Sequence, residues 1–98
     1  MSELVFLLSA NLDIQRAYDF YEDFQEGRGA VFMAHLDAAF GQLRTFPASG
    51  PVVFRNNRRL LVSGYPYGIF YTIEARGVII SGVMDIRQDP EAIFRRLS

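Results

Sequence analysis

The side chains best suited to binding lie in the second half of the chain. Arg59 and Arg87 carry planar guanidinium groups, which can donate paired hydrogen bonds to a carboxylate or a phosphate. Tyr65, Tyr67 and Tyr71 offer rings that could stack against a bound group. General acid–base catalysis needs proton donors and acceptors within hydrogen-bond reach, and few such groups accompany these residues. We therefore predict that the five residues bind a target and that none of them is catalytic.

The single histidine, His35, does not indicate a metal site. It lies at the edge of an apolar helical stripe without Asp or Cys at ligand spacing, and the chain has no cysteine. We predict no metal, no cofactor and an interface role for His35. The lack of cysteine also excludes disulfides, which favours a cytoplasmic location.

Length and hydropathy predict one soluble domain over residues 1–98. Half of the 98 residues are hydrophobic, and a chain this short seldom divides into two cores. The longest apolar runs, 4–8 and 78–80, are far shorter than the roughly 20 residues that span a bilayer. We therefore expect no membrane segment.

Charge is distributed unevenly along the chain. Residues 1–27 hold six acids against one arginine, a net charge of −5, whereas the remainder holds nine arginines against five acids, or +4. A cationic region of this kind suits an acidic protein partner. The formal net charge of −1 lacks the basic excess that phosphate binding requires, so direct nucleic-acid binding is disfavoured.

Hydrophobic spacing predicts a strand and two helices in the first half. Residues 3–9 read as an internal strand because both of its faces are apolar. A first helix is expected from an N-cap at Asn11 to about Gln25, and a second follows Gly27 and ends before Pro47. The two helices should form an antiparallel hairpin.

The second half predicts four strands and a short helix. Residues 52–55 and 58–62 form one hairpin through Asn56-Asn57, and residues 69–74 and 78–83 form another. A helix over 91–97 begins after Asp89-Pro90. The order βααββββ predicts an α+β fold of two layers, with the helical hairpin packed on an antiparallel sheet.

The ordered motifs resemble the RelE/ParE toxin superfamily over nearly the whole chain. In the sheet region the resemblance lies at Arg59-Leu60-Leu61, Tyr65-Pro66-Tyr67, Ile69, Tyr71, Ile73, Val83, Arg87 and Asp89-Pro90. In the helices it lies at Asp13, Ile14, Ala17, Tyr18, Tyr21, Phe32, Leu36, Ala39, Leu43, Pro47 and Gly50. The resemblance implies the toxin half of a type II toxin–antitoxin system.

The superfamily has two functional branches, and three residues favour the ParE-like branch. Toxins that cut mRNA keep a basic residue on the strand after the turn and a His or Tyr near the chain end. Here Gly68 takes the place of that basic residue, Asp85 takes that of the His, and Gln88 replaces a second Arg. Asp85 would repel a phosphate instead of stabilising its charge. The resemblance therefore implies a protein that binds DNA gyrase and is neutralised by a cognate antitoxin.

Residues expected at the antitoxin interface are Tyr18, Tyr21, His35, Arg58, Phe70 and Phe94. A homodimer through the helical hairpin remains open. Two alternative functions also stay open, namely a RelE-like ribosome-dependent endoribonuclease that uses Arg59, Arg87 and Tyr71, and a nontoxic interaction module.

Plain structural roles compete with these functional ones. Arg59 could pair with Glu74 or Asp85 across the sheet. Tyr67 and Tyr71 could be half-buried sheet residues with a hydrated hydroxyl. Arg95 and Arg96 could simply meet the C-terminal dipole of the last helix.

Overall fold

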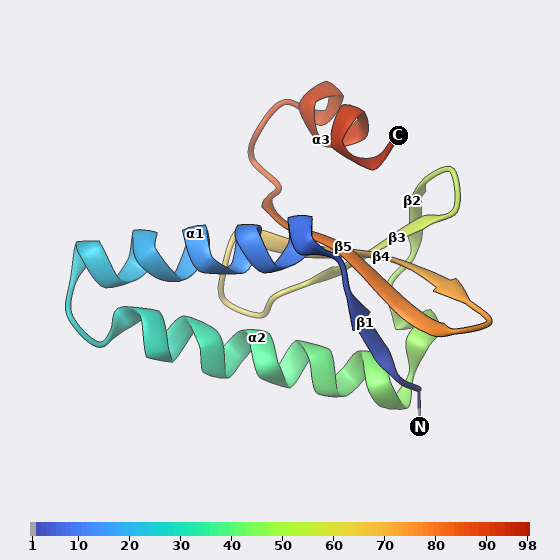
Figure 1. Ribbon diagram of the computed structural model, residues 1–98. Coiled ribbons are helices and arrows are strands. Elements are labelled where there is room, and N and C mark those ends of the chain that lie inside the picture. Colours follow the sequence, from blue (N-terminus) through green and yellow to red (C-terminus); the bar gives the residue numbers. More distant parts are fainter. Residues whose placement is uncertain (1) are drawn as a thin grey trace.

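The computed structural model describes residues 2–98 and shows an α+β fold built on one sheet (Figure 1). Its elements within those residues are β1 (Leu4–Phe6), α1 (Leu8–Phe24), α2 (Arg28–Thr45), a 3-10 turn (Pro47–Ser49), β2 (Val52–Phe54), β3 (Asn57–Leu61), β4 (Tyr67–Glu74), β5 (Gly77–Asp85) and α3 (Pro90–Leu97). The predicted fold class and element order are confirmed.

The sheet is mixed, with the strand order β1-β5-β4-β3-β2. The last four strands pair antiparallel, as predicted, but β1 runs parallel to β5 with Val5 opposite Ile79. The prediction of an internal first strand is wrong, because β1 lies at the sheet edge and has only three residues. One reason for its apolar character is that Phe6 packs edge-on against Phe40 of α2, with ring centroids 5.0 Å apart.

The predicted N-cap at Asn11 is also wrong, because α1 begins at Leu8, three residues earlier. Leu7 occupies the cap position, and no side chain caps the helix there. The Leu7 amide donates to the Ile80 carbonyl, while the Leu7 carbonyl accepts from the Ala10 and Asn11 amides. Tertiary hydrogen bonds thus turn the chain directly from β1 into the helix.

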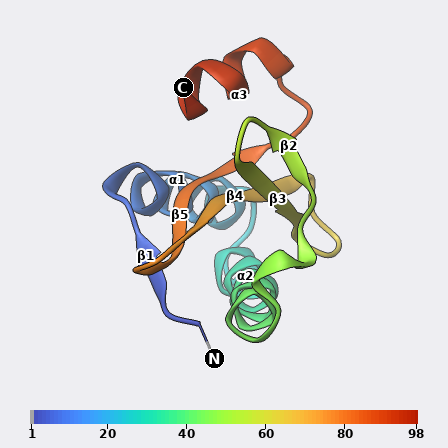
Figure 2. The ribbon, with the colours of Figure 1, turned by 90° about the vertical axis from the view of Figure 1, so that its right-hand side faces the viewer.

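Helices α1 and α2 form the predicted antiparallel hairpin and cover one face of the sheet (Figure 2). Glu22 caps α2, since its carboxylate accepts from the Gly27 and Gly29 amides at 3.0–3.1 Å. Gly27 has a φ of 89°, a conformation that costs glycine little. The main core lies between this hairpin and the sheet, and includes Ala17, Phe32, Leu36, Leu43, Ile69, Tyr71, Ile80 and Val83.

The opposite face of the sheet is covered by α3, which packs over a second, smaller cluster of Phe70, Met84 and Ile93 (Figure 2). Asp89 caps α3 by accepting from the Glu91 amide at 3.1 Å, which confirms the predicted helix start. Phe94 stacks on Phe54 of β2 with centroids 4.5 Å apart and ring planes 8° apart. The last helix therefore adds a partial third layer.

Both predicted hairpins form, with one shift in the first. The β2–β3 turn consists of Arg55 and Asn56, because Phe54 pairs with Asn57, and Arg55 takes a positive φ of 53°. In the second hairpin the register shifts between Phe70 and Tyr71, which leaves Ser81 as a bulge. No helix within residues 2–98 is long and apolar enough to cross a membrane.

Candidate functional site

The structure divides the five predicted target-binding residues among three environments. Tyr65 and Tyr67 join an aromatic cluster with Tyr21, Phe32 and His35 beside the helical hairpin. Burial raises the pKa of Tyr67, and Arg87 lies close enough to offset part of that rise. Arg59 pairs with Phe70, so its side chain is on the face of the sheet covered by α3. Tyr71 is buried in the main core. The five residues therefore do not form one site.

Tyr65 and Tyr67 pack with residues of both helices in the aromatic cluster. The Tyr65 ring lies 5.1 Å from Tyr21 of α1 and 5.0 Å from Phe32 of α2, measured between centroids. The His35 ring lies edge-on to Tyr65 at 5.3 Å and is otherwise exposed. Half-exposed rings that pack on one side against other residues of the fold are typical of anchors in protein interfaces.

Tyr21 and Tyr67 of this cluster have raised pKa values. Burial is the main cause that raises the pKa of Tyr21, and the neighbouring Tyr67 and Tyr65 raise it further. Burial likewise raises the pKa of Tyr67, with the Asp85 carboxylate as a second cause. Both hydroxyls therefore stay protonated at neutral pH and can donate hydrogen bonds.

Arg87 is held by Asp85 at the end of β5. Its Nη2 lies 2.7 Å from Asp85 Oδ2 and its Nε 3.1 Å from Oδ1. The hydrogen bond from Arg87 holds the pKa of Asp85 below its usual range, and Asp85 in turn raises the pKa of Arg87. Because both groups are charged, the Asp85 carboxylate already neutralises the Arg87 guanidinium within the same chain.

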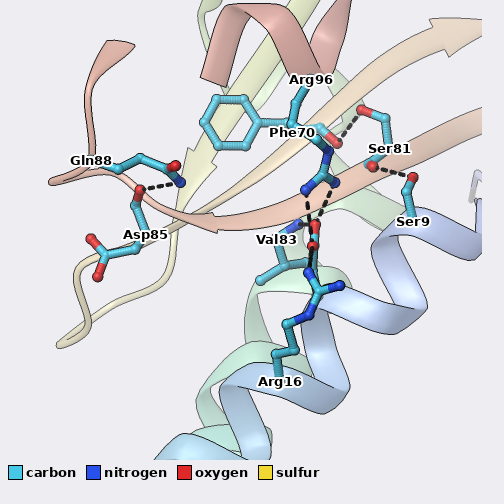
Figure 3. A network of polar contacts seen from close by, with 9 residues as sticks. Ser9, Arg16, Phe70, Ser81, Val83, Asp85, Gln88 and Arg96 are labelled. Carbon is cyan, nitrogen blue, oxygen red and sulfur yellow. Dashed lines mark hydrogen bonds and ion pairs between the residues drawn. The ribbon is translucent and has the colours of Figure 1, made fainter. Parts of the chain in front are cut away.

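A polar network joins α1, β5 and α3 next to this pair (Figure 3). Asp13 is only 6% exposed, yet it accepts from Arg96 at 2.7 and 3.1 Å and from the Val83 amide at 3.0 Å. Arg16 lies 3.6 Å from the same carboxylate. Arg96 therefore connects α3 to α1, which is a more specific role than the predicted contact with a helix dipole.

Sequence analysis missed this network, although one signal was present. Asp13 occupies the helical stripe between Ala10 and Ala17, which are both buried, so an acid at that position requires a buried partner. A cavity of about 360 Å³ adjoins the network and is lined by Asp13, Arg16, Ala17, Phe20, Tyr67, Val83, Met84, Asp85, Gln88 and Arg96.

Arg59 forms neither of the ion pairs predicted for it. Glu74 is paired with Arg76, and Asp85 with Arg87. The Arg59 stem instead crosses Gly68, where an added Cβ would lie 2.9 Å from Arg59 Cγ. Because Gly68 has no side chain, the Arg59 side chain has room to lie across it.

Tyr71 is fully buried, so the expectation of a half-buried ring with a hydrated hydroxyl is wrong for this residue. Its hydroxyl donates to the Pro47 carbonyl at 2.6 Å and accepts from the Gly50 amide at 2.9 Å. Burial raises the pKa of Tyr71. In this conformation Tyr71 cannot reach a target, and its role is to anchor the loop between α2 and β2.

The residues predicted at the antitoxin interface are spread over both faces of the molecule. Tyr18 packs on Gly29 within the hairpin, and Arg58 donates to the Gly50 carbonyl at 2.9 Å. Phe70 is buried beneath α3, beside Phe94. Tyr21 and His35 lie together in the aromatic cluster already described. One continuous surface therefore does not contain all six residues.

Comparison with known proteins places the chain in a family. Residues 4–90 match the model of the family described as "ParE toxin of type II toxin-antitoxin system, parDE". A search of the curated proteins finds no match.

Among solved structures, the chain is similar to one described as "Chromosomal ParDE TA system from P. aeruginosa". The TM-score is 0.77 at 16% sequence identity, and the alignment covers 87% of this chain and 96% of that one. Identity at this level demonstrates a shared fold alone, whereas the family match spans most of the sequence. The chain belongs to the ParE toxin family of type II toxin–antitoxin systems.

Proposed function

We propose that this protein inhibits DNA gyrase by binding it, without cutting RNA, and that a cognate antitoxin neutralises it in the cytoplasm. The observation that carries the proposal is the Asp85–Arg87 ion pair at 2.7 Å. Asp85 stands where RNA-cutting relatives keep a proton-transferring residue, and it occupies one of the two arginines that could have bound a phosphate.

The remaining candidate groups for RNA cleavage are badly placed for a shared reaction. Cleavage requires a base for the 2′-OH, an acid for the leaving oxygen and a cation at the phosphate, all within hydrogen-bond reach. Arg59 lies on the face covered by α3, Tyr71 is buried, and Tyr67 is protonated at neutral pH because burial raises its pKa. This separation favours a function based on binding.

The aromatic cluster is the surface that we propose for the gyrase contact. Tyr65, Tyr67, Tyr21 and His35 gather there from both helices and the segment that leads into β4. Aromatic residues are enriched among the anchors of protein–protein interfaces, because they bury a large area with little loss of side-chain entropy.

An antitoxin is supported by the apolar surface of the described chain. Phe20, Phe24 and Phe46 are 60%, 75% and 65% exposed. Phe20 and Phe24 lie one turn apart on α1, and adjacent exposed aromatic side chains of this kind favour a partner that covers them. The cationic residues of the C-terminal region would attract an acidic antitoxin segment.

The test is inducible expression followed by parallel assays of plasmid topology and message integrity. We expect growth arrest, loss of negative supercoiling and intact messages. Tyr65→Ala should weaken the arrest at an unchanged protein level, whereas Arg95→Ala, on the outer side of α3, should not. Messages cut at defined sites would support the endoribonuclease alternative, and normal growth would support the nontoxic interaction module.

A further inference from the structure

A small pocket lies between the sheet and α3, on the face that is turned away from the helical hairpin. Strands β2, β3 and β4 form its floor, and α3 forms one wall. It holds about 240 Å³ and is lined by Val53, Arg59, Phe70, Pro90, Ile93 and Phe94. Arg59 is the single charged side chain in an otherwise apolar lining. Because an unpaired cation among apolar side chains is unfavourable, a counter-charge is expected there.

No group within residues 2–98 supplies that counter-charge. None of the ion pairs includes Arg59, and its buried Nε has no hydrogen-bond partner. The side chain is only half-buried, and its two terminal nitrogens keep contact with solvent. The Arg59 stem lies across Gly68, so the guanidinium is already in place at the pocket. Arg59 is therefore positioned to bind an anion that enters from solvent.

We propose that this pocket binds a small organic acid, in which one carboxylate is joined to a compact apolar group. The carboxylate accepts hydrogen bonds from the two terminal nitrogens of Arg59, a paired geometry that suits a guanidinium. The apolar group packs against Phe70 and Ile93. A phosphate fits less well, because its charge of close to −2 exceeds that of the single cation.

The surroundings of the pocket favour a free small molecule over a protein partner. The volume lies below the roughly 300–1,000 Å³ of pockets for drug-sized ligands, so the pocket admits one compact group. A standard protein interface needs roughly 800 Å² from each partner. Helix α3, which the structure describes over its whole length, exposes no large apolar side chain that would add to such an interface.

A bound acid contacts both β3 and α3, so it should hold the last helix more firmly on the sheet. A ligand that binds only the folded arrangement stabilises it by mass action. Hydrogen exchange of the α3 amides should therefore slow when the acid is present. The site lies on the opposite face of the sheet from the aromatic cluster, and its existence does not depend on the proposed gyrase function.

Phenylacetate is a suitable test ligand, and phenylacetamide is its neutral control of nearly the same shape. A titration of isotope-labelled protein, followed by nuclear magnetic resonance, should shift the amide signals of Phe70 and Ile93. Phenylacetamide should bind at least about tenfold more weakly, because it lacks the charge that strengthens the hydrogen bonds from Arg59. Equal binding of the two compounds would overturn the proposal, as would shifts confined to the aromatic cluster.

Arg59→Met tests the residue itself, since it removes the guanidinium and keeps a long apolar stem. It should abolish the preference for phenylacetate, whereas Arg95→Met, with the same change of charge at an exposed position of α3, should retain it. Without ligand, Arg59→Met should be at least as stable in urea as wild type, because it removes an unpaired buried donor. A clear loss of stability would show that the guanidinium serves the fold and would overturn the proposal. The comparison of the two compounds on wild type does not depend on either variant.

Discussion

At the scale of single residues, the Asp85–Arg87 ion pair supports the proposed binding function over RNA cleavage. The carboxylate pairs with the Arg87 guanidinium, which is then not free to bind a phosphate. Burial raises the pKa of the neighbouring Tyr67, and the charge of Asp85 raises it further. One acidic side chain therefore acts against both the cation and the general base that cleavage would need.

The Asp85 pair should make stability depend on pH in the acid range. Because the folded-state pKa of Asp85 is lowered, its contribution is present above the unfolded pKa of about 3.9 and is lost as pH falls through the folded value. Denaturant unfolding of wild type and Asp85→Asn should differ most above about pH 4 and converge in stronger acid. Glu26→Gln is the control at an exposed acid, and a constant difference across pH would contradict this account.

Tyr71→Phe should destabilise the fold without affecting the surface. The substitution leaves the Pro47 carbonyl and the Gly50 amide without their hydroxyl partner, and an unsatisfied buried polar group costs roughly 1–3 kcal/mol. Urea unfolding should show a lower free energy of unfolding, and Tyr65→Phe on a half-buried ring should show little change. Equal effects of the two substitutions would argue against a structural role for the Tyr71 hydroxyl.

At the scale of elements, α3 is attached by a small apolar cluster and one ion pair. Phe70, Met84 and Ile93 form the cluster, and Arg96 binds the buried Asp13. The ion pair fixes where the helix lies relative to α1, since apolar contacts alone are not directional.

Arg96→Leu should loosen α3 and destabilise the fold by about 1–3 kcal/mol, because it leaves the Asp13 carboxylate buried without its cation. Hydrogen exchange of the α3 amides should accelerate more than that of α2. Arg95→Leu, one residue away and exposed, is the matched control. Unchanged protection of α3 in Arg96→Leu would show that the apolar cluster is sufficient.

Local spacing was enough to predict the helical hairpin, both β-hairpins and the start of the last helix at Asp89-Pro90, because each depends on neighbouring residues. It failed where partners are distant in sequence. The parallel pairing of β1 with β5 joins residues more than 70 positions apart, and Asp13 bonds to residues 70 and 83 positions away. The positions of Arg59 and Tyr71 could not be predicted for the same reason. The surroundings of Arg59 depend on which face of the sheet α3 covers, and the burial of the Tyr71 hydroxyl depends on the loop at Pro47–Gly50.

For the whole molecule, the sheet separates two surfaces with different properties. The aromatic cluster lies on the hairpin side, whereas Arg59 lies on the face covered by α3. The aromatic surface therefore lies on the hairpin side of the sheet, and Arg59 on the opposite face contributes to packing.

The antitoxin should stabilise the toxin as a whole. Any partner that binds only the folded chain raises its apparent stability by mass action, by about 2.7 kcal/mol at a concentration 100 times the dissociation constant. Addition of the cognate antitoxin should raise the melting temperature of the toxin. A melting temperature that does not change with antitoxin concentration would contradict neutralisation by direct binding.

The most direct test of the central claim combines purified toxin with purified gyrase and relaxed plasmid, beside a translating extract that carries a defined message. The account predicts inhibited supercoiling with gyrase trapped on cleaved DNA, weakened by Tyr65→Ala, and an uncut message. Normal supercoiling together with a message cut at defined sites, lost in Arg59→Ala or Arg87→Ala, would contradict it.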